Sequence, residues 1–156
     1  METAVKNIHK LLINKGKTVS VAESCSGGLV SSLLTEEPGS SAYFIAGIIP
    51  YSNQAKESLL KIPKSIIKKN GAVSEKVARL MASRARMIFK TDFGIGVTGI
   101  AGPAGATPTK PVGTVFIAVA GKNKLTCRKF NFTGNRDSIR KKTAQSAMVL
   151  LRSRLK

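Results

Sequence analysis

Apolar positions along the chain recur with a helical period in some stretches and an extended period in others. Residues 3–15 carry apolar side chains at helical spacing and are followed by Gly16, a common helix stop. An apolar, β-branched run at 18–23 predicts a strand, and the apolar positions from Gly27 to Thr35 return to helical spacing. The chain therefore opens with a helix, a strand and a second helix.

The same alternation continues to the C-terminus. The further predicted elements are a strand at 43–50, helices at 53–60 and 74–88 with a short segment at 63–70 between them, a strand at 92–97, a hairpin at 113–120 and 125–132, and a helix from Asn135 or Asp137 to the end. This order favours an α/β fold, a three-layer α/β/α sandwich with a mixed sheet. We expect residues 1–156 to form a single domain, because a chain of this length suffices for one core.

Composition limits the environment of the protein. Apolar residues make up 42% of the chain, and no apolar run approaches the roughly 20 residues that span a bilayer. No basic, apolar, small-residue signal sequence is recognisable, so we expect a cytoplasmic protein without a membrane partner. Cys25 and Cys127 are expected to be reduced thiols, and with His9 they supply too few ligands for zinc. We expect neither a metal nor a cofactor.

Positive charge dominates the titratable residues. The chain has 26 Lys and Arg against 8 Asp and Glu, a formal net charge of +18, which is typical of proteins that bind nucleic acid, anionic membranes or phosphorylated substrates. The basic residues are spread over nearly every segment, and aromatic residues, at 5% with no Trp, are too few for a base-stacking surface. We therefore favour a solvated basic surface that attracts anionic substrates, and we do not expect a nucleic-acid partner.

The stretch Ser-Cys-Ser-Gly-Gly at 24–28 separates the first predicted strand from the second predicted helix. Such a junction brings small hydroxyl groups, free backbone N–H groups and the positive end of a helix dipole together, which suits an oxyanion or a phosphate. We interpret it as an active-site turn. The structural alternative is that Ser26 caps the helix and Ser24 is an ordinary turn residue.

Three motif matches predict no chemistry. The match to G-x-G-x-x-G at 94–99 lies inside a strand, no helix follows, and no acidic residue stands about twenty positions later to bind a ribose. Two S-x-x-K matches, at 58–61 and 65–68, lack the accompanying S-D-N and K-T-G motifs. No G-x-S-x-G is present and His9 has no evident partner, so a Ser-His-Asp triad is not expected.

A hydrolase without histidine or metal requires another base, and a lysine can serve if its pKa falls from about 10.4 toward 7 or 8. Lys56 lies in the early part of the helix that Ser52 is expected to cap, where the helix dipole disfavours the cation. Desolvation would have to supply the remaining shift. The alternative is a solvated helix lysine, as most lysines are.

Six sequence blocks carry a resemblance to a known family. They are Ala-Glu-Ser-Cys-Ser-Gly-Gly at 22–28, Pro-Gly-Ser-Ser at 38–41, Tyr-Ser-Asn-Gln-Ala-Lys at 51–56, Gly-Ala-Val-Ser at 71–74, Thr-Gly-Ile-Ala-Gly-Pro at 98–103 and Lys-Pro-Val-Gly-Thr-Val at 110–115. In this order, across nearly the whole chain, they resemble the CinA C-terminal domain family, which includes nicotinamide mononucleotide (NMN) deamidase. The family also occurs fused behind a nucleotide-hydrolysing domain, and we expect this chain to be the stand-alone form.

The resemblance implies an amidohydrolase that releases ammonia from the carboxamide of NMN and leaves nicotinic acid mononucleotide, through a Ser/Lys dyad and an acyl-enzyme. Carried onto this sequence, Ser24 matches the nucleophile, Lys56 the general base and Tyr51 a supporting tyrosine. Thr98 matches a residue of the substrate loop, and Arg140 an arginine suited to the mononucleotide phosphate. A homodimer is also expected from the resemblance.

The remaining candidate residues surround these. We expect backbone N–H groups near Ser26, Gly27 and Gly28 to hold the oxyanion, and Gly99 and Gly102 to let the backbone approach the substrate. Further candidates for substrate binding are Ser40 and Ser41 of the Pro-Gly-Ser-Ser block and Glu23, which either orients the dyad or substrate or simply ends the strand.

The chain departs from the family pattern at two places. Ser26 stands where the family usually has Thr, and Ala104-Gly105-Ala106 replaces the frequent Asp-Gly-Gly, which removes a carboxylate from the expected substrate loop. Cys25 is a rival nucleophile, expected to point to the opposite side of the turn. The alternative function is a non-catalytic, competence-associated module of the same fold that binds a ligand or nucleic acid.

Overall fold

The computed structural model describes residues 2–156, with side chains from Ala4 onward. Its centre is a five-stranded sheet in the order β2-β1-β3-β4-β5. The strands are β1 (Val19–Glu23), β2 (Phe44–Ile48), β3 (Phe93–Gly99), β4 (Thr114–Ala120) and β5 (Leu125–Asn131). β1 runs parallel to both β2 and β3, whereas β4 and β5 continue the sheet as antiparallel strands. The sheet is therefore mixed, as the sequence predicted.

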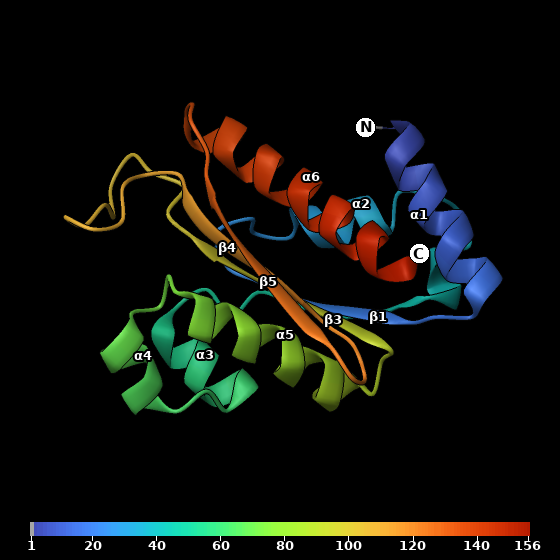
Figure 1. The fold of residues 1–156 in the computed structure, drawn as a ribbon, viewed down its shortest axis with the longest axis horizontal. Helices are drawn as coiled ribbons and strands as arrows, with labels where there is room; N and C mark the ends of the chain where they lie inside the picture. Colours follow the sequence, from blue (N-terminus) through green and yellow to red (C-terminus); the bar gives the residue numbers. More distant parts are fainter. Residues whose placement is uncertain (1) are drawn as a thin grey trace.

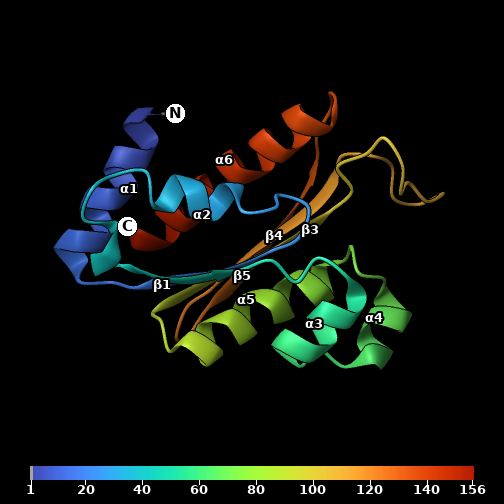
Figure 2. The ribbon, with the colours of Figure 1, turned by 180° about the vertical axis from the view of Figure 1, so that it is seen from behind.

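Helices cover both faces of this sheet (Figure 1). The helices are α1 (Glu2–Lys15), α2 (Leu29–Leu34), α3 (Asn53–Leu60), α4 (Lys64–Asn70), α5 (Glu75–Phe89) and α6 (Arg136–Leu155), with a short 3-10 turn at Ser40–Ala42. α1, α2 and α6 lie on one face and α3, α4 and α5 on the other, and the view from behind shows the same two layers (Figure 2). The three-layer α/β/α architecture predicted from the sequence is confirmed.

The positions of the helices follow from the handedness of strand connections. α2 lies between β1 and β2, whereas α3 to α5 connect β2 with β3, on the other side of β1. Because crossovers between parallel strands are right-handed, connections that run in opposite directions along a sheet place their helices on opposite faces. Because β1, β2 and β3 are parallel, their carboxyl ends lie at the same end of the sheet.

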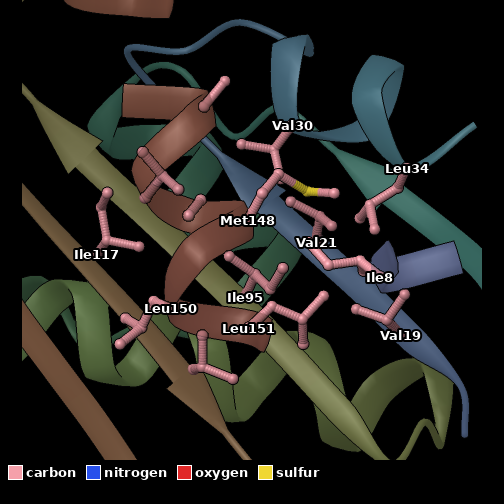
Figure 3. Close-up of a cluster of buried hydrophobic side chains, with 14 of the residues drawn as sticks. Ile8, Val19, Val21, Val30, Leu34, Ile95, Ile117, Met148, Leu150 and Leu151 are labelled. Atoms are coloured by element: carbon pink, nitrogen blue, oxygen red, sulfur yellow. The ribbon is translucent and has the colours of Figure 1, made fainter. Parts of the chain in front are cut away.

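The larger part of the core lies between the sheet and the layer of α1, α2 and α6. Figure 3 shows Val21 of β1 and Ile95 of β3 beneath Met148 and Leu151 of α6, and all four side chains are buried. α6 packs on β3 and β4. Alternate residues of these strands point to this face and contact the apolar side chains of the helix. This core therefore holds β1 and β3 in place, and with them the carboxyl ends of these strands.

Two glycines of β3 allow α5 to lie close against the sheet. A Cβ atom on Gly94 or Gly96 would overlap with the backbone of α5, at Ala82 and at Ala78 respectively. These glycines form part of the G-x-G-x-x-G match, and helix packing, rather than a phosphate, accounts for them. The rejection of a dinucleotide-binding motif therefore agrees with the structure.

Several predicted element boundaries differ in the structure. The second helix does not begin at Gly27: it spans Leu29–Leu34, because Gly27 and Gly28 have positive φ angles of 58° and 99° and continue the turn. The strand predicted to end at residue 97 extends to Gly99, so Thr98 and Gly99 belong to β3 and not to the loop that follows it. The loop that follows extends away from the body of the molecule (Figure 1).

Within residues 2–156, no helix has both the length and the apolar character needed to cross a membrane.

Replacement of Gly96 by alanine tests the close packing of α5 on β3. A Cβ on Gly96 would lie 2.9 Å from the Met81 Cβ and would overlap with the backbone of the helix, so we expect Gly96→Ala to lower the unfolding free energy by about 1–3 kcal/mol. Gly121→Ala is the matched control, because the nearest atoms to its Cβ would lie 3.4 Å away at a φ open to alanine. Urea denaturation of both variants measures the difference, and equal stabilities would contradict this packing.

Candidate active site

The candidate active site forms where the three parallel strands end. Ser24 directly follows β1, Thr98 and Gly99 end β3, and the segment after β2 leads through Tyr51 to α3. The Ser24 N–H donates to the Val97 carbonyl at 3.0 Å, which ties the turn to the neighbouring strand. In α/β sheets, ligands bind in the crevice outside the carboxyl ends of the strands.

Lys56 and Ser24, 32 residues apart, lie within hydrogen-bond distance. The Lys56 Nζ is 3.2 Å from the Ser24 Oγ, and it also donates to the carbonyl oxygens of Pro50 at 3.1 Å and Tyr51 at 3.0 Å. Ser52 caps α3 by accepting from the Ala55 N–H at 3.0 Å, as predicted, and this fixes the start of the helix that carries Lys56. The lysine is only 2% exposed, so it is not the solvated helix lysine of the alternative interpretation.

Burial lowers the pKa of Lys56 below its ordinary value of 10.5, because desolvation penalises the ammonium more than the neutral amine. Two of the three partners of Nζ are carbonyl oxygens, which can only accept hydrogen bonds. A neutral amine fits them with its two N–H groups, and its lone pair then faces the Ser24 hydroxyl. The geometry therefore suits a lysine that removes the serine proton.

The buried Glu23 carboxylate holds the turn in place through hydrogen bonds. It is 0% exposed, and it accepts hydrogen bonds from the Ser26 hydroxyl, the Val30 N–H, and the N–H and hydroxyl of Ser31, at distances from 2.8 to 3.1 Å. The carboxylate thus satisfies the first N–H groups of α2 in place of a capping residue, since the cap position, Gly28, has no side chain. Neither Glu23 nor Ser26 lines the cavity, and the hydrogen bond between them lies inside the turn.

A cavity of about 220 Å³ lies above the Ser24 and Lys56 pair. Its lining residues are Ser24, Cys25, Tyr51, Asn53, Lys56, Ala72, Val73, Thr98, Gly99, Ala101 and Arg136. The Thr98 hydroxyl donates to the Ala72 carbonyl at 2.8 Å, so it is held in a fixed orientation at the wall. A larger, more open hollow of about 500 Å³ lies elsewhere, around Arg86 and Lys90, but it contains no nucleophile paired with a base.

Sequence reasoning missed Arg136 and Asn53. Arg136 lines the cavity and donates to the Gly102 carbonyl at 2.8 Å and to the Tyr51 hydroxyl at 3.0 Å. Arg140, the arginine that the resemblance selected, instead contacts the Ser26 carbonyl at 3.3 Å and does not line the cavity. The sequence places Arg136 directly after Asn135, the cap of the last helix, but no local pattern separates it from Arg140 one turn later.

Other predicted site residues lie outside the cavity. Ser40 and Ser41 precede β2 at the amino end of the parallel strands, where Phe44 pairs with Val19, so within this chain they do not share a site with Ser24. The Gly27 N–H, an expected oxyanion donor, already donates to the Ser24 carbonyl at 3.1 Å. Gly102 does not line the cavity, but its carbonyl accepts a hydrogen bond from Arg136, which does.

Cys25, the rival nucleophile, is buried in the core beside Gly99, where an added Cβ would lie 2.9 Å from its Sγ. Burial, together with the nearby Glu23 charge, raises the pKa of the Cys25 thiol to about 12. A thiol in this state is a poor nucleophile. Ala104, where the family often has Asp, is exposed and does not line the cavity.

Among residues 2–156, no group of three or more His, Cys, Asp or Glu side chains is placed to hold a metal ion.

The fold and the site define a mixed-sheet α/β domain in which a buried lysine is hydrogen-bonded to the serine of a Ser-Cys-Ser-Gly-Gly turn. Residues 1–155 match the CinA C-terminal domain, and the chain belongs to this family. The resemblance drawn from the sequence blocks is therefore confirmed.

Known relatives agree with this assignment. A CinA-like protein from Geotalea uraniireducens is 48% identical over 154 residues, which are 99% of this chain and 37% of that protein. A CinA-like protein from Thermotoga neapolitana is 45% identical over 147 residues, 94% of this chain and 36% of that protein. The chain thus spans little more than a third of the length of these relatives.

Solved structures share the fold over nearly the whole chain. The competence/damage inducible protein CihA from Agrobacterium tumefaciens is similar at a TM-score of 0.95 with 36% sequence identity, covering 97% of this chain and 93% of that one. A competence-damaged protein (CinA) superfamily protein from Klebsiella pneumoniae is similar at a TM-score of 0.94 with 26% identity, covering 98% and 96%.

The hydrogen bonds of Glu23 predict a cost for losing its charge. In Glu23→Gln, the amide nitrogen would face the N–H and O–H donors that now point to a carboxylate, so we expect the unfolding free energy to fall by about 1–3 kcal/mol. Glu36→Gln, at an exposed position, is the control and should leave stability nearly unchanged. Denaturant titration checks both, and a fully stable Glu23→Gln would contradict this role.

The lowered pKa of Lys56 predicts how stability depends on pH. Between the folded-state pKa and 10.5, the unfolded chain binds a proton at Lys56 that the folded chain does not, so raising the pH stabilises the folded state. We expect the unfolding free energy of wild type to rise relative to that of Lys56→Met as the pH rises from 7 toward 10.5. Paired denaturant titrations measure this difference, and a constant or falling difference would exclude a lowered pKa.

Proposed function

We propose that the protein is an amidohydrolase that hydrolyses the carboxamide of nicotinamide mononucleotide, releasing ammonia and nicotinic acid mononucleotide. The observation that carries the proposal is the buried Lys56 Nζ, 3.2 Å from the Ser24 Oγ at the floor of a cavity. The residues implied by the family resemblance as nucleophile and base are thus within reach of one another.

The reaction follows from this geometry. The Lys56 amine takes the proton of the Ser24 hydroxyl as the serine oxygen bonds to the carboxamide carbon. The resulting ammonium then protonates the leaving nitrogen, the C–N bond breaks, and ammonia departs from an acyl-enzyme. Lys56 next takes a proton from water, whose oxygen attacks the acyl carbon, and the proton returns to Ser24 as the ester bond breaks.

The oxyanion of this reaction requires donors that are not already bonded. Because the Gly27 N–H donates to the Ser24 carbonyl, we assign part of this role to Asn53, which lines the cavity and whose carboxamide carries N–H groups. Asn53 opens α3, the helix that also carries Lys56. A single short helix would therefore supply both the base and an oxyanion donor.

The charge of the cavity supports an anionic substrate. Arg136 lines it, and none of its lining residues is acidic. A guanidinium matches the geometry of a phosphate, and Arg136 lines the cavity whereas Arg140 does not, so Arg136 is our candidate for the mononucleotide phosphate in place of Arg140. The position of Ala104 outside the cavity means that the departure from the family pattern removes no group from the lining.

The burial of Lys56 favours catalysis over a purely binding role. Burying a lysine costs free energy unless its charge is paired, and no acidic side chain contacts Lys56 in the described chain. A binding module would gain nothing from this cost. An enzyme gains a base whose pKa lies closer to neutrality.

Ammonia release from NMN tests the proposal. We expect turnover by wild type, a loss of at least about 1000-fold in kcat for Ser24→Ala and Lys56→Met, and a far smaller loss for Cys25→Ala. Because Lys56 acts as the free amine, kcat/KM should rise with pH up to a pKa below 10.5. Circular dichroism confirms that each variant is folded.

Folded wild-type protein that releases no ammonia from NMN between neutral and mildly alkaline pH would refute the proposed function. The non-catalytic module would then be the better interpretation. Turnover that survives Lys56→Met would preserve the activity but exclude this lysine as its base.

A further inference from the structure

Arg136 and Tyr51 form a bridge at the cavity, although 85 residues separate them in the sequence. The Arg136 Nη2 donates to the Tyr51 hydroxyl at 3.0 Å, and its Nη1 donates to the Gly102 carbonyl at 2.8 Å. The arginine opens α6, the tyrosine lies between β2 and α3, and the glycine follows β3. One guanidinium therefore joins three separate segments around the cavity.

Tyr51 also contacts the base, through its backbone. Its carbonyl accepts from the Lys56 Nζ at 3.0 Å, while its own N–H donates to the Ile49 carbonyl at 2.8 Å. The next residue, Ser52, caps α3 and accepts from the Lys56 N–H at 3.1 Å. Main-chain bonds thus tie the backbone of Tyr51 to the helix of the base, whereas its side chain is 56% exposed and bonds to Arg136.

This bridge leaves donors for an anion. A guanidinium has five N–H groups, and the two bonds to Tyr51 and Gly102 use only part of them. Because the Tyr51 hydroxyl accepts from Arg136, its own proton remains for a further acceptor. A phosphate at this place would bond to both side chains and hold them together.

We propose that Tyr51 is a positioning residue through which a phosphate bound at Arg136 fixes Lys56 against Ser24. This inference rests on the proposed function. The phosphate, which takes no part in the chemistry, then contributes to kcat as well as to binding, since binding energy from a remote group aligns the reacting ones. Tyr51 acts here through its carbonyl on Lys56 and is not itself a general acid or base of the reaction.

A substrate supplied in two pieces tests this coupling. Nicotinamide riboside is NMN without its phosphate, and inorganic phosphate is the missing piece. We expect wild type to hydrolyse the riboside with a kcat at least about 10-fold below that for NMN, and added phosphate to raise that kcat about 10-fold with saturation. A structural role alone would not produce activation by a separate ion.

Three variants locate the effect. Tyr51→Phe removes the hydroxyl and keeps the carbonyl that contacts Lys56, so it should lose most of the phosphate activation, measured as the ratio of the riboside kcat with and without phosphate. Arg136→Gln should lose the activation entirely. Lys141→Gln is the matched control, because it removes one positive charge from the same helix at a residue 61% exposed and paired with Asp137, and it should retain the activation.

Several results would overturn the inference in protein that hydrolyses NMN. These are riboside hydrolysis that phosphate does not accelerate, no riboside hydrolysis at any phosphate concentration, or activation that Tyr51→Phe leaves at the wild-type level. An equal loss in Lys141→Gln and Arg136→Gln would overturn it as well, because it would indicate general charge attraction. Absence of NMN hydrolysis by wild type would instead refute the proposed function, and with it this inference.

Discussion

The burial of one lysine beside one serine is the constraint on which the site depends. Lys56 is 2% exposed and has no acidic partner among the described side chains, so its nitrogen depends on oxygen acceptors, which the carbonyls of Pro50 and Tyr51 supply. Those carbonyls are in place because β2 ends just before them and Ser52 begins α3 just after. Opposite the lysine, the buried Glu23 carboxylate fixes the turn that carries Ser24. Two separate sets of hydrogen bonds therefore fix the positions of Lys56 and of the turn that carries Ser24.

Local patterns in the sequence predicted the layers of the fold, whereas the family resemblance selected Ser24 and Lys56, the pair that the structure brings together. The apolar periods identified nearly every helix and strand, and Ser52 and Ser74 cap their helices as expected, because capping depends only on neighbouring residues. The start of α2 was placed two residues early. Its cap position is Gly28, and the Glu23 carboxylate of the preceding strand accepts from the helix N–H groups instead. No local capping pattern contains that contact.

Contacts between distant segments could not be predicted in this way. Arg136 and Arg140 are one helical turn apart, so helical periodicity gives them the same face; only the position of α6 over the sheet sends one to the cavity and the other to the Ser26 carbonyl. Ser40 and Ser41 matched the family pattern, yet the parallel direction of β2 places them at the other end of the sheet. A match to one of the family's sequence blocks therefore did not show that a residue lies at the site.

The central claim is that burial lowers the pKa of Lys56, so that its free amine can take the Ser24 proton in the proposed reaction. NMR titration of protein labelled with ¹⁵N at its lysine side chains, with Lys56 assigned from its absence in Lys56→Met, measures this directly. We predict that the Lys56 Nζ titrates below 10.5 and that its midpoint coincides with the rise of kcat/KM with pH. A midpoint at or above 10.5 would contradict the account, because the lysine would then remain an ammonium unable to accept the Ser24 proton.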